Sequence, residues 1–199
     1  MTPSLQEICN LIADQGVKKA ESLRVIFATI SSKVTGKDLG KKELDTVFKI
    51  FSFLNWAYAN GMWSNLSNTE LRRDLMAQSG KSIVLKLSFE MSENKENSHV
   101  AMYAVNLEEE FRTFAMNYID RLKQLERSGH QPDANTALLY GLECLQDKIG
   151  FDNREMDSIV PTFLRQSENF AEIEKTANQI NLAFTETKRK GFFARLFGS

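Results

Sequence analysis

The chain has 199 residues, a formal net charge of −1, 42% hydrophobic residues and 26% charged residues. This composition is ordinary for a globular protein and excludes a strongly basic chain built to bind nucleic acid. Three prolines and ten glycines are too few for long linkers. We therefore expect one domain over residues 1–187, followed by a short tail over residues 188–199.

The N-terminal residues and the cysteines indicate a cytoplasmic protein. Residues 1–10 lack a basic region and a long apolar stretch, so no signal peptide is expected. The densest aromatic run, residues 44–63, is too short and too interrupted to span a bilayer. Cys9 and Cys144 fall in apolar helical patterns typical of buried thiols, and two cysteines make no disulfide framework.

Two helices are predicted before residue 36. Thr2 and Pro3 form a helix start, and Gly16 is a candidate end of the first helix. Gly36 is a candidate end of the second helix. The apolar residues of the second helix recur at helical spacing and are Ala20, Leu23, Phe27, Ile30 and Val34.

Residues 44–63 form the aromatic helix around which we expect the rest of the chain to pack. Its aromatic residues are Phe48, Phe51, Phe53, Trp56, Tyr58 and Trp63. A helix that is apolar nearly all round belongs inside a bundle, with neighbours on several sides. Asn60 and Gly61 are predicted to end it. Ser67 with Glu70 forms a capping box for the next helix, and Gly80 is its candidate end.

Residues 82–106 allow two interpretations. Apolar residues alternate with polar ones from Ile83 to Met91, which favours a β-hairpin over about 83–105 closed by a polar loop. The competing interpretation is helical, because apolar residues recur at spacings of four and three from Val100 to Tyr118. Periodicity in short apolar runs does not decide between the two.

The rest of the chain is predicted to be helical. Asn106 is a candidate cap of a helix that runs to about Arg127, and Pro132 with Asp133 opens another that Gly150 ends. Asp152 caps a short segment, and Pro161 kinks or restarts the chain. A long final helix carries an apolar stripe of Phe163, Phe170, Ile173, Ala177, Ile180 and Phe184. We therefore expect a mainly α bundle of six to eight helices.

No residue pattern points to a catalytic, cofactor or metal site. Residues 80–82 read Gly-Lys-Ser like the end of a phosphate loop, but the required glycine five places earlier is Leu75. The two histidines, His99 and His130, fall in expected loops and are too few for a di-iron bundle. We expect neither thiol to act as a nucleophile, because sequence places no histidine beside it. We expect no cofactor.

The C-terminal tail is the one segment whose pattern suggests a contact. Its basic and apolar residues follow one another and are Lys188, Arg189, Lys190, Phe192, Phe193, Arg195, Leu196 and Phe197. Large apolar groups clustered at a chain end usually mark a contact. Such a tail can pack on its own core, dock into a protein partner, or lie on an anionic membrane surface.

The leading hypothesis is a non-enzymatic interaction or regulatory protein whose tail docks onto a protein partner or a membrane surface. One alternative is a bundle that binds an apolar small molecule among its aromatic helices. Another is an enzyme whose reaction the sequence does not reveal. Nucleic acid is not an expected partner, because the net charge is −1.

Overall fold

The computed structural model describes residues 4–63, 69–130 and 134–166. Within these ranges the chain forms six α-helices and no strand. The helices are α1 (Leu5–Thr35), α2 (Lys41–Trp63), α3 (Thr69–Met91), α4 (Asn97–Arg127), α5 (Ala134–Ile149) and α6 (Asn153–Gln166). The predicted mainly α bundle is confirmed.

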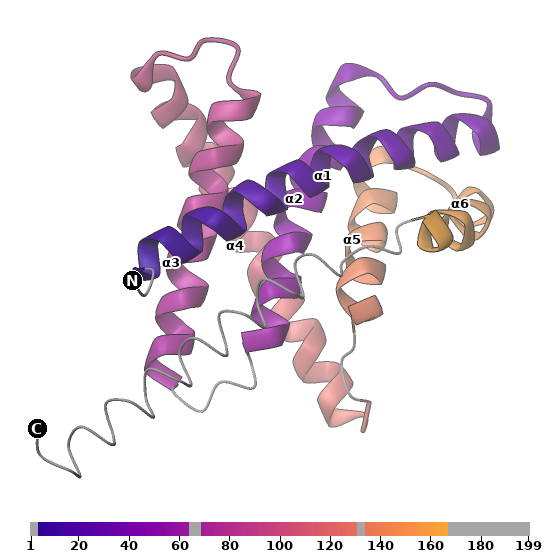
Figure 1. Ribbon diagram of the computed structural model, residues 1–199. Coiled ribbons are helices and arrows are strands. Elements are labelled where there is room, and N and C mark those ends of the chain that lie inside the picture. Colours follow the sequence, from indigo (N-terminus) through magenta and orange to yellow (C-terminus); the bar gives the residue numbers. More distant parts are fainter. Residues whose placement is uncertain (1–3, 64–68, 131–133, 167–199) are drawn as a thin grey trace, which may run out of the picture.

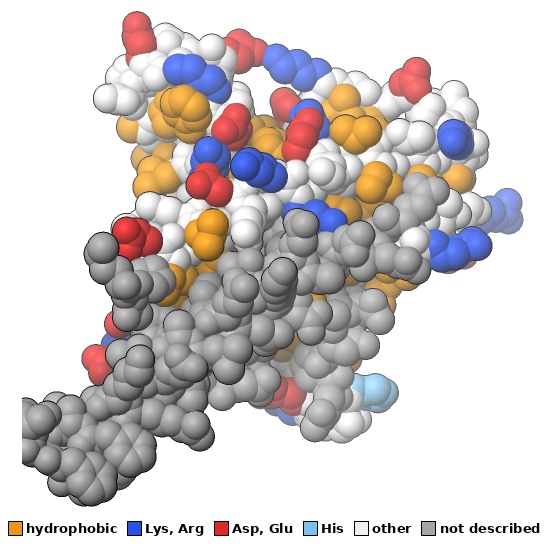
Figure 2. Space-filling model, in the orientation of Figure 1, with side chains coloured by type: hydrophobic (Ala, Val, Ile, Leu, Met, Phe, Trp, Pro, Cys, Tyr) orange, Lys and Arg blue, Asp and Glu red, His pale blue; other side chains and the backbone are white. Residues whose placement is uncertain are grey.

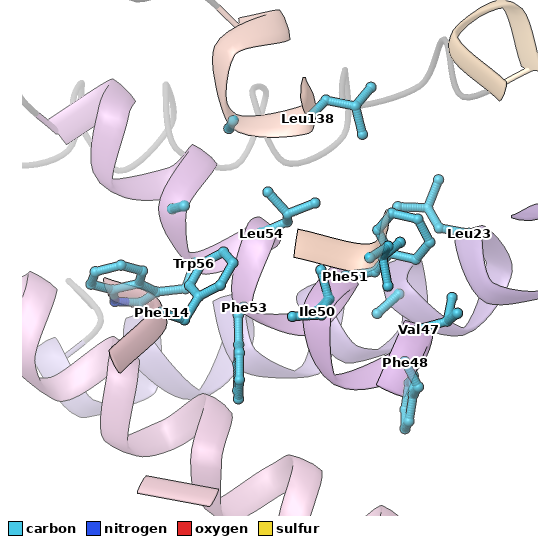
Figure 3. Close-up of a cluster of buried hydrophobic side chains, with 14 of the residues drawn as sticks. Leu23, Val47, Phe48, Ile50, Phe51, Phe53, Leu54, Trp56, Phe114 and Leu138 are labelled. Atoms are coloured by element: carbon cyan, nitrogen blue, oxygen red, sulfur yellow. The ribbon is translucent and has the colours of Figure 1, made fainter. Parts of the chain in front are cut away.

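Helix α2 is the centre of the bundle, as its aromatic sequence predicts. It packs against α1, α3, α4 and α5, while α1 lies across the other helices and also contacts α6 (Figure 1). Figure 3 shows side chains of α2 pointing in several directions into this core. The residues of α2 that are buried are Val47, Phe48, Ile50, Phe51, Ser52, Phe53, Leu54, Asn55, Trp56, Ala57 and Ala59.

Three phenylalanines from different helices form an aromatic cluster in the core. Phe51 of α2 stacks on Phe163 of α6, with ring centroids 5.3 Å apart. Phe27 of α1 meets both rings edge-on, at 5.9 Å from Phe51 and 5.6 Å from Phe163. All three side chains are fully buried. This cluster therefore holds α6 against the crossing of α1 and α2.

Several predicted helix ends are confirmed. Gly36 ends α1 with a φ of 70°, and Gly150 follows α5 with a φ of 82°, a left-handed conformation that glycine adopts without strain. Asp152 caps α6, because its carboxylate accepts a hydrogen bond from the Glu155 N–H at 2.8 Å. The first helix begins with a capping box of Ser4 and Glu7. The predicted start at Thr2 and Pro3 lies outside the described residues.

The predicted helix ends at Gly16, Asn60–Gly61 and Gly80 are wrong. Helix α1 runs through Gly16, and a Cβ there would lie 3.2 Å from Cβ of Asn55 on α2. The buried Asn55 amide donates to the Gly16 carbonyl oxygen at 2.7 Å. Helix α3 likewise runs through Gly80, and α2 continues to Trp63. At Gly16 and Gly80, glycine lets two helices approach closely instead of ending one.

The predicted β-hairpin over residues 83–105 is wrong, and the helical interpretation is correct. Helix α3 extends to Met91, and α4 begins at Asn97, nine residues before the predicted cap Asn106. On α3 the helical period buries Ile83 and Leu87 one turn apart, together with Leu75. Burying these residues on one helical face stabilises the helix more than the alternating pattern could stabilise an isolated two-stranded hairpin.

Of the predictions for the second half of the chain, one helix end is confirmed, one is wrong, and others fall outside the described residues. Helix α4 ends at Arg127, as predicted. Helix α6 continues past Pro161, so the predicted restart there is wrong. Helix starts predicted from Ser67 and from residues 132–133 fall in gaps between the described ranges. The stripe from Phe170 to Phe184 and the domain boundary at residue 187 also lie outside them.

Candidate functional site

An apolar groove between α3 and α4 is the main surface feature of the described residues. Its volume is about 430 Å³. Leu85 of α3 and Val105 and Met116 of α4 form its rims and are 59%, 68% and 60% exposed. The floor consists of small, buried or half-buried residues of both helices, which are Gly80, Val84, Ala104, Phe111 and Ala115. Large exposed apolar side chains that cluster around one groove usually mark a contact surface.

The groove is hollow because a glycine lies at the helix contact. A Cβ at Gly80 would lie 2.8 Å from Cε1 of Phe111 on α4. Phe111 is held in turn by edge-on contacts with Trp56 and Phe53 of α2, with ring centroids 4.9 and 5.2 Å away. The Trp56 indole N–H also donates to the Met76 carbonyl oxygen of α3 at 3.1 Å. The central helix therefore fixes both walls of the groove.

The groove is lined by both acidic and basic side chains. Lys81 lies on the α3 wall, and Glu108 and Arg112 lie on the α4 wall. Arg112 pairs with Glu108 at 3.4 Å across one turn of the helix, and both side chains are more than half exposed. Such an exposed pair contributes little to stability. Arg112 can therefore exchange this partner for an acidic group on a bound molecule at small cost.

A second hollow lies between α2, α4 and α5, with a volume of about 450 Å³. Phe53, Phe114 and Tyr140 form its aromatic side, and the Tyr140 hydroxyl donates to the Phe114 carbonyl oxygen at 3.4 Å. Its other side is polar and includes Glu110, which pairs with Lys49 at 2.7 Å. The hollow is large enough for a small molecule that has one apolar and one polar side.

Both cysteines occupy surroundings that disfavour the thiolate. Burial raises the pKa of Cys9 to about 11. Burial also raises the pKa of Cys144, which lies in the second hollow beside Tyr140, and burial raises the pKa of the Tyr140 hydroxyl. A thiol that stays protonated at neutral pH is a weak nucleophile. The environment of both thiols is therefore that of core residues.

A third depression, between α1, α2 and α3, is lined by charged residues of both signs, several of which form ion pairs within it or with residues beside it. Lys86 contacts Asp14 at 3.1 Å and Arg24 contacts Glu21 at 2.5 Å, while Lys41 at the other end contacts Glu93 at 2.6 Å. Figure 2 shows acidic and basic side chains intermixed on this face. The depression therefore presents no concentrated charge of either sign.

The residues considered for nucleotide or metal chemistry lie on α3 and at the two ends of α4. Gly80, Lys81 and Ser82 lie inside α3, so they form no phosphate loop. His99 is in the first turn of α4, and His130 follows the end of that helix, where its N–H bonds to the Leu125 carbonyl oxygen, roughly 40 Å away along the helix. Within the described ranges, no group of three His, Cys, Asp or Glu side chains is placed to hold a metal ion.

The predicted contact residues of the tail, 188–197, lie outside the described residues. The sequence analysis does not predict the groove between α3 and α4, because it leaves residues 82–106 open between a hairpin and a helix. The sequence does contain a pattern that indicates the groove. On a helix, Leu85 and Phe89 lie off the buried face of α3, and Val105 and Met116 lie off the buried face of α4.

None of the helices in the described stretches combines the length and apolar character that a bilayer span requires. No family model, curated protein or solved structure matches this chain. The fold and the groove define its class as an all-α helical bundle with an open apolar surface between two of its helices.

Proposed function

We propose that this protein is a non-enzymatic interaction protein that binds other protein chains through the groove between α3 and α4. The observation that carries the proposal is the exposure of Leu85, Val105 and Met116 around a 430 Å³ apolar groove. Grooves of this kind accept the apolar face of a helix, with a few large side chains as anchors. The walls are held by the core through Phe111 and Trp56, so the groove is preformed.

The substitution Leu85→Asp tests the groove. Leu85 is 59% exposed, so the variant keeps the fold and its melting temperature stays within a few degrees of the wild type. We expect it to lose the proteins that the tagged wild-type chain captures, because a charge on the rim must be desolvated on binding. Quantitative mass spectrometry of the captured proteins measures this loss.

Val25→Asp is the matched control, since Val25 is 57% exposed on α1 and lies away from the groove. It should capture the same proteins as the wild type. Equal capture by Leu85→Asp and Val25→Asp would refute the groove as the contact. A chain that lacks residues 188–199 belongs in the same experiment.

The tail over residues 188–199 is the second element of the proposal. It supplies four basic and four large apolar side chains, and we assign it to a protein contact. Its deletion should remove partners and leave thermal stability almost unchanged. If the deletion instead lowers the free energy of unfolding by several kcal/mol, the tail is part of the core. Binding of the intact chain to anionic lipid vesicles, lost on deletion, would reassign the tail to a membrane surface.

A second candidate function is the binding of a small molecule in the hollow between α2, α4 and α5. The aromatic side formed by Phe53, Phe114 and Tyr140 supports it. Native mass spectrometry of the purified chain distinguishes the candidates. A bound molecule would appear as added mass, and it would persist in Leu85→Asp if it occupies this hollow.

A further inference from the structure

The outer face of α4 carries an apolar stripe where a surface helix ordinarily carries polar residues. The inner face of α4 is already used, because Leu107, Phe114 and Tyr118 are buried against the bundle. Opposite them, Met102, Val105 and Met116 are 65%, 68% and 60% exposed. A helix with a core face needs no second apolar face for its own stability. An exposed second apolar face of this kind is typical of a contact surface.

The outer stripe has the spacing of an interhelical seam. Its positions are separated by 3, 4, 3, 4 and 3 residues and are Met102, Val105, Glu109, Arg112, Met116 and Ile119. This is the heptad spacing at which two helices pack side by side. Val105, Arg112, Met116 and Ile119 also line the groove, so a helix on the seam would meet Leu85 of α3 as well.

The stripe is complementary to itself in the antiparallel direction. A two-fold axis between positions 110 and 111 places Met102 opposite Ile119 of a second copy and Val105 opposite Met116 of that copy. It also places Glu109 opposite Arg112 of the second copy. Parallel pairing would instead put Glu109 beside Glu109 and Arg112 beside Arg112, which repels. Self-complementarity about a two-fold axis is what a symmetric dimer requires.

We infer that the partner on this face is a second copy of the chain, joined by antiparallel packing of α4 on α4. The inference rests on the proposed function in that it names the partner of the groove. The apolar pairs supply the contact area over about 25 Å of helix. The two ion pairs between Glu109 and Arg112 set the direction and register, because only this alignment places each Glu109 opposite an Arg112 of the other copy.

Charge reversal at the two central positions tests the inference, with sedimentation equilibrium of the full chain as the measurement. The wild type should be a dimer at micromolar concentration. Glu109→Arg and Arg112→Glu should each weaken self-association about a hundredfold, because symmetry places like charges together twice. Mixed in equal amounts, the two variants should form a heterodimer. The double variant Glu109→Arg with Arg112→Glu should again be a dimer.

Asp157→Arg, an equal charge change at an exposed position of α6, should leave the dimer intact. A monomeric wild type, or a dimer that survives both single reversals, would overturn the inference. So would two variants that fail to associate when mixed. A failed dimer test leaves the groove as a binding site if Leu85→Asp still loses captured proteins that Val25→Asp retains. If the two variants capture the same proteins, the groove is not the binding site.

Discussion

Replacing Phe51 by alanine should lower the free energy of unfolding by about 3–5 kcal/mol. Phe51 is fully buried on α2 and joins three helices, through a stacked contact with Phe163 and an edge contact with Phe27. Removing the ring leaves a cavity that rigid neighbours on α1 and α6 cannot close. The melting temperature should fall by about 6–20 °C for a chain of this size. Denaturant unfolding of the full chain measures the change.

The matched control for this prediction is Phe89→Ala. Phe89 lies on α3, is 47% exposed and contacts Lys95 through its ring face. Its removal should cost less than about 1 kcal/mol, because about half of the side chain already contacts water. If the two variants lose equal stability, the aromatic cluster of Phe27, Phe51 and Phe163 is not the centre of the core.

Replacing Gly141 by alanine should destabilise the protein by about 1–3 kcal/mol, although alanine is the better helix former. Gly141 is buried in α5 where that helix crosses α2. A Cβ there would lie 2.1 Å from Cδ1 and 2.7 Å from Cγ of Leu54, whose side chain is itself buried. In an exposed helix the same change would stabilise by about 1 kcal/mol. The sign of the measured change therefore shows whether the two helices are in contact.

A double-mutant cycle with Leu54→Ala isolates this contact. Leu54→Ala alone should cost about 2–5 kcal/mol, because it opens a cavity. In its presence the three atoms that lie nearest to the added methyl group at position 141 are absent, and the methyl group fills part of the space. The double variant should then lose at least about 1 kcal/mol less in free energy of unfolding than the sum of the two single losses. Additive losses would mean that Leu54 and Gly141 do not touch.

The groove and the seam on α4 give the two outer helices a role that the core does not require. Small residues form the floor of the groove between α3 and α4, and large exposed apolar residues form its rims. The same α4 residues that edge the groove also form the stripe around Glu109 and Arg112. A second copy and any other chain would therefore compete for one surface. This competition would make binding depend on the concentration of the protein itself.

Much of the fold could be predicted from the sequence. The aromatic run of α2 was predicted to lie among several neighbours, and its residues are buried on nearly all sides. The helix ends at Gly36 and Gly150 and the cap at Asp152 were also predicted. These features depend on residues within one or two turns of each other, so neighbouring residues carry the information.

The errors occurred where a distant residue decides the local structure. Gly16 and Gly80 were predicted to end helices, yet each lies beside a side chain from another helix, Asn55 and Phe111. Glycine in a helix costs about 1 kcal/mol, which close packing between helices readily offsets. The alternation from Ile83 to Met91 favoured a strand, but neighbouring helices bury Ile83 and Leu87 on one helical face.

The sequence by itself determined that this protein is a helical bundle built on residues 44–63, and it marked the helix ends whose chemistry is local. Only the tertiary structure decided which glycines are contact points, and only it revealed the groove between α3 and α4 and the second apolar face of α4. The reason is physical. Exposure depends on which apolar residues the neighbouring helices cover, and residues far apart in the chain determine that.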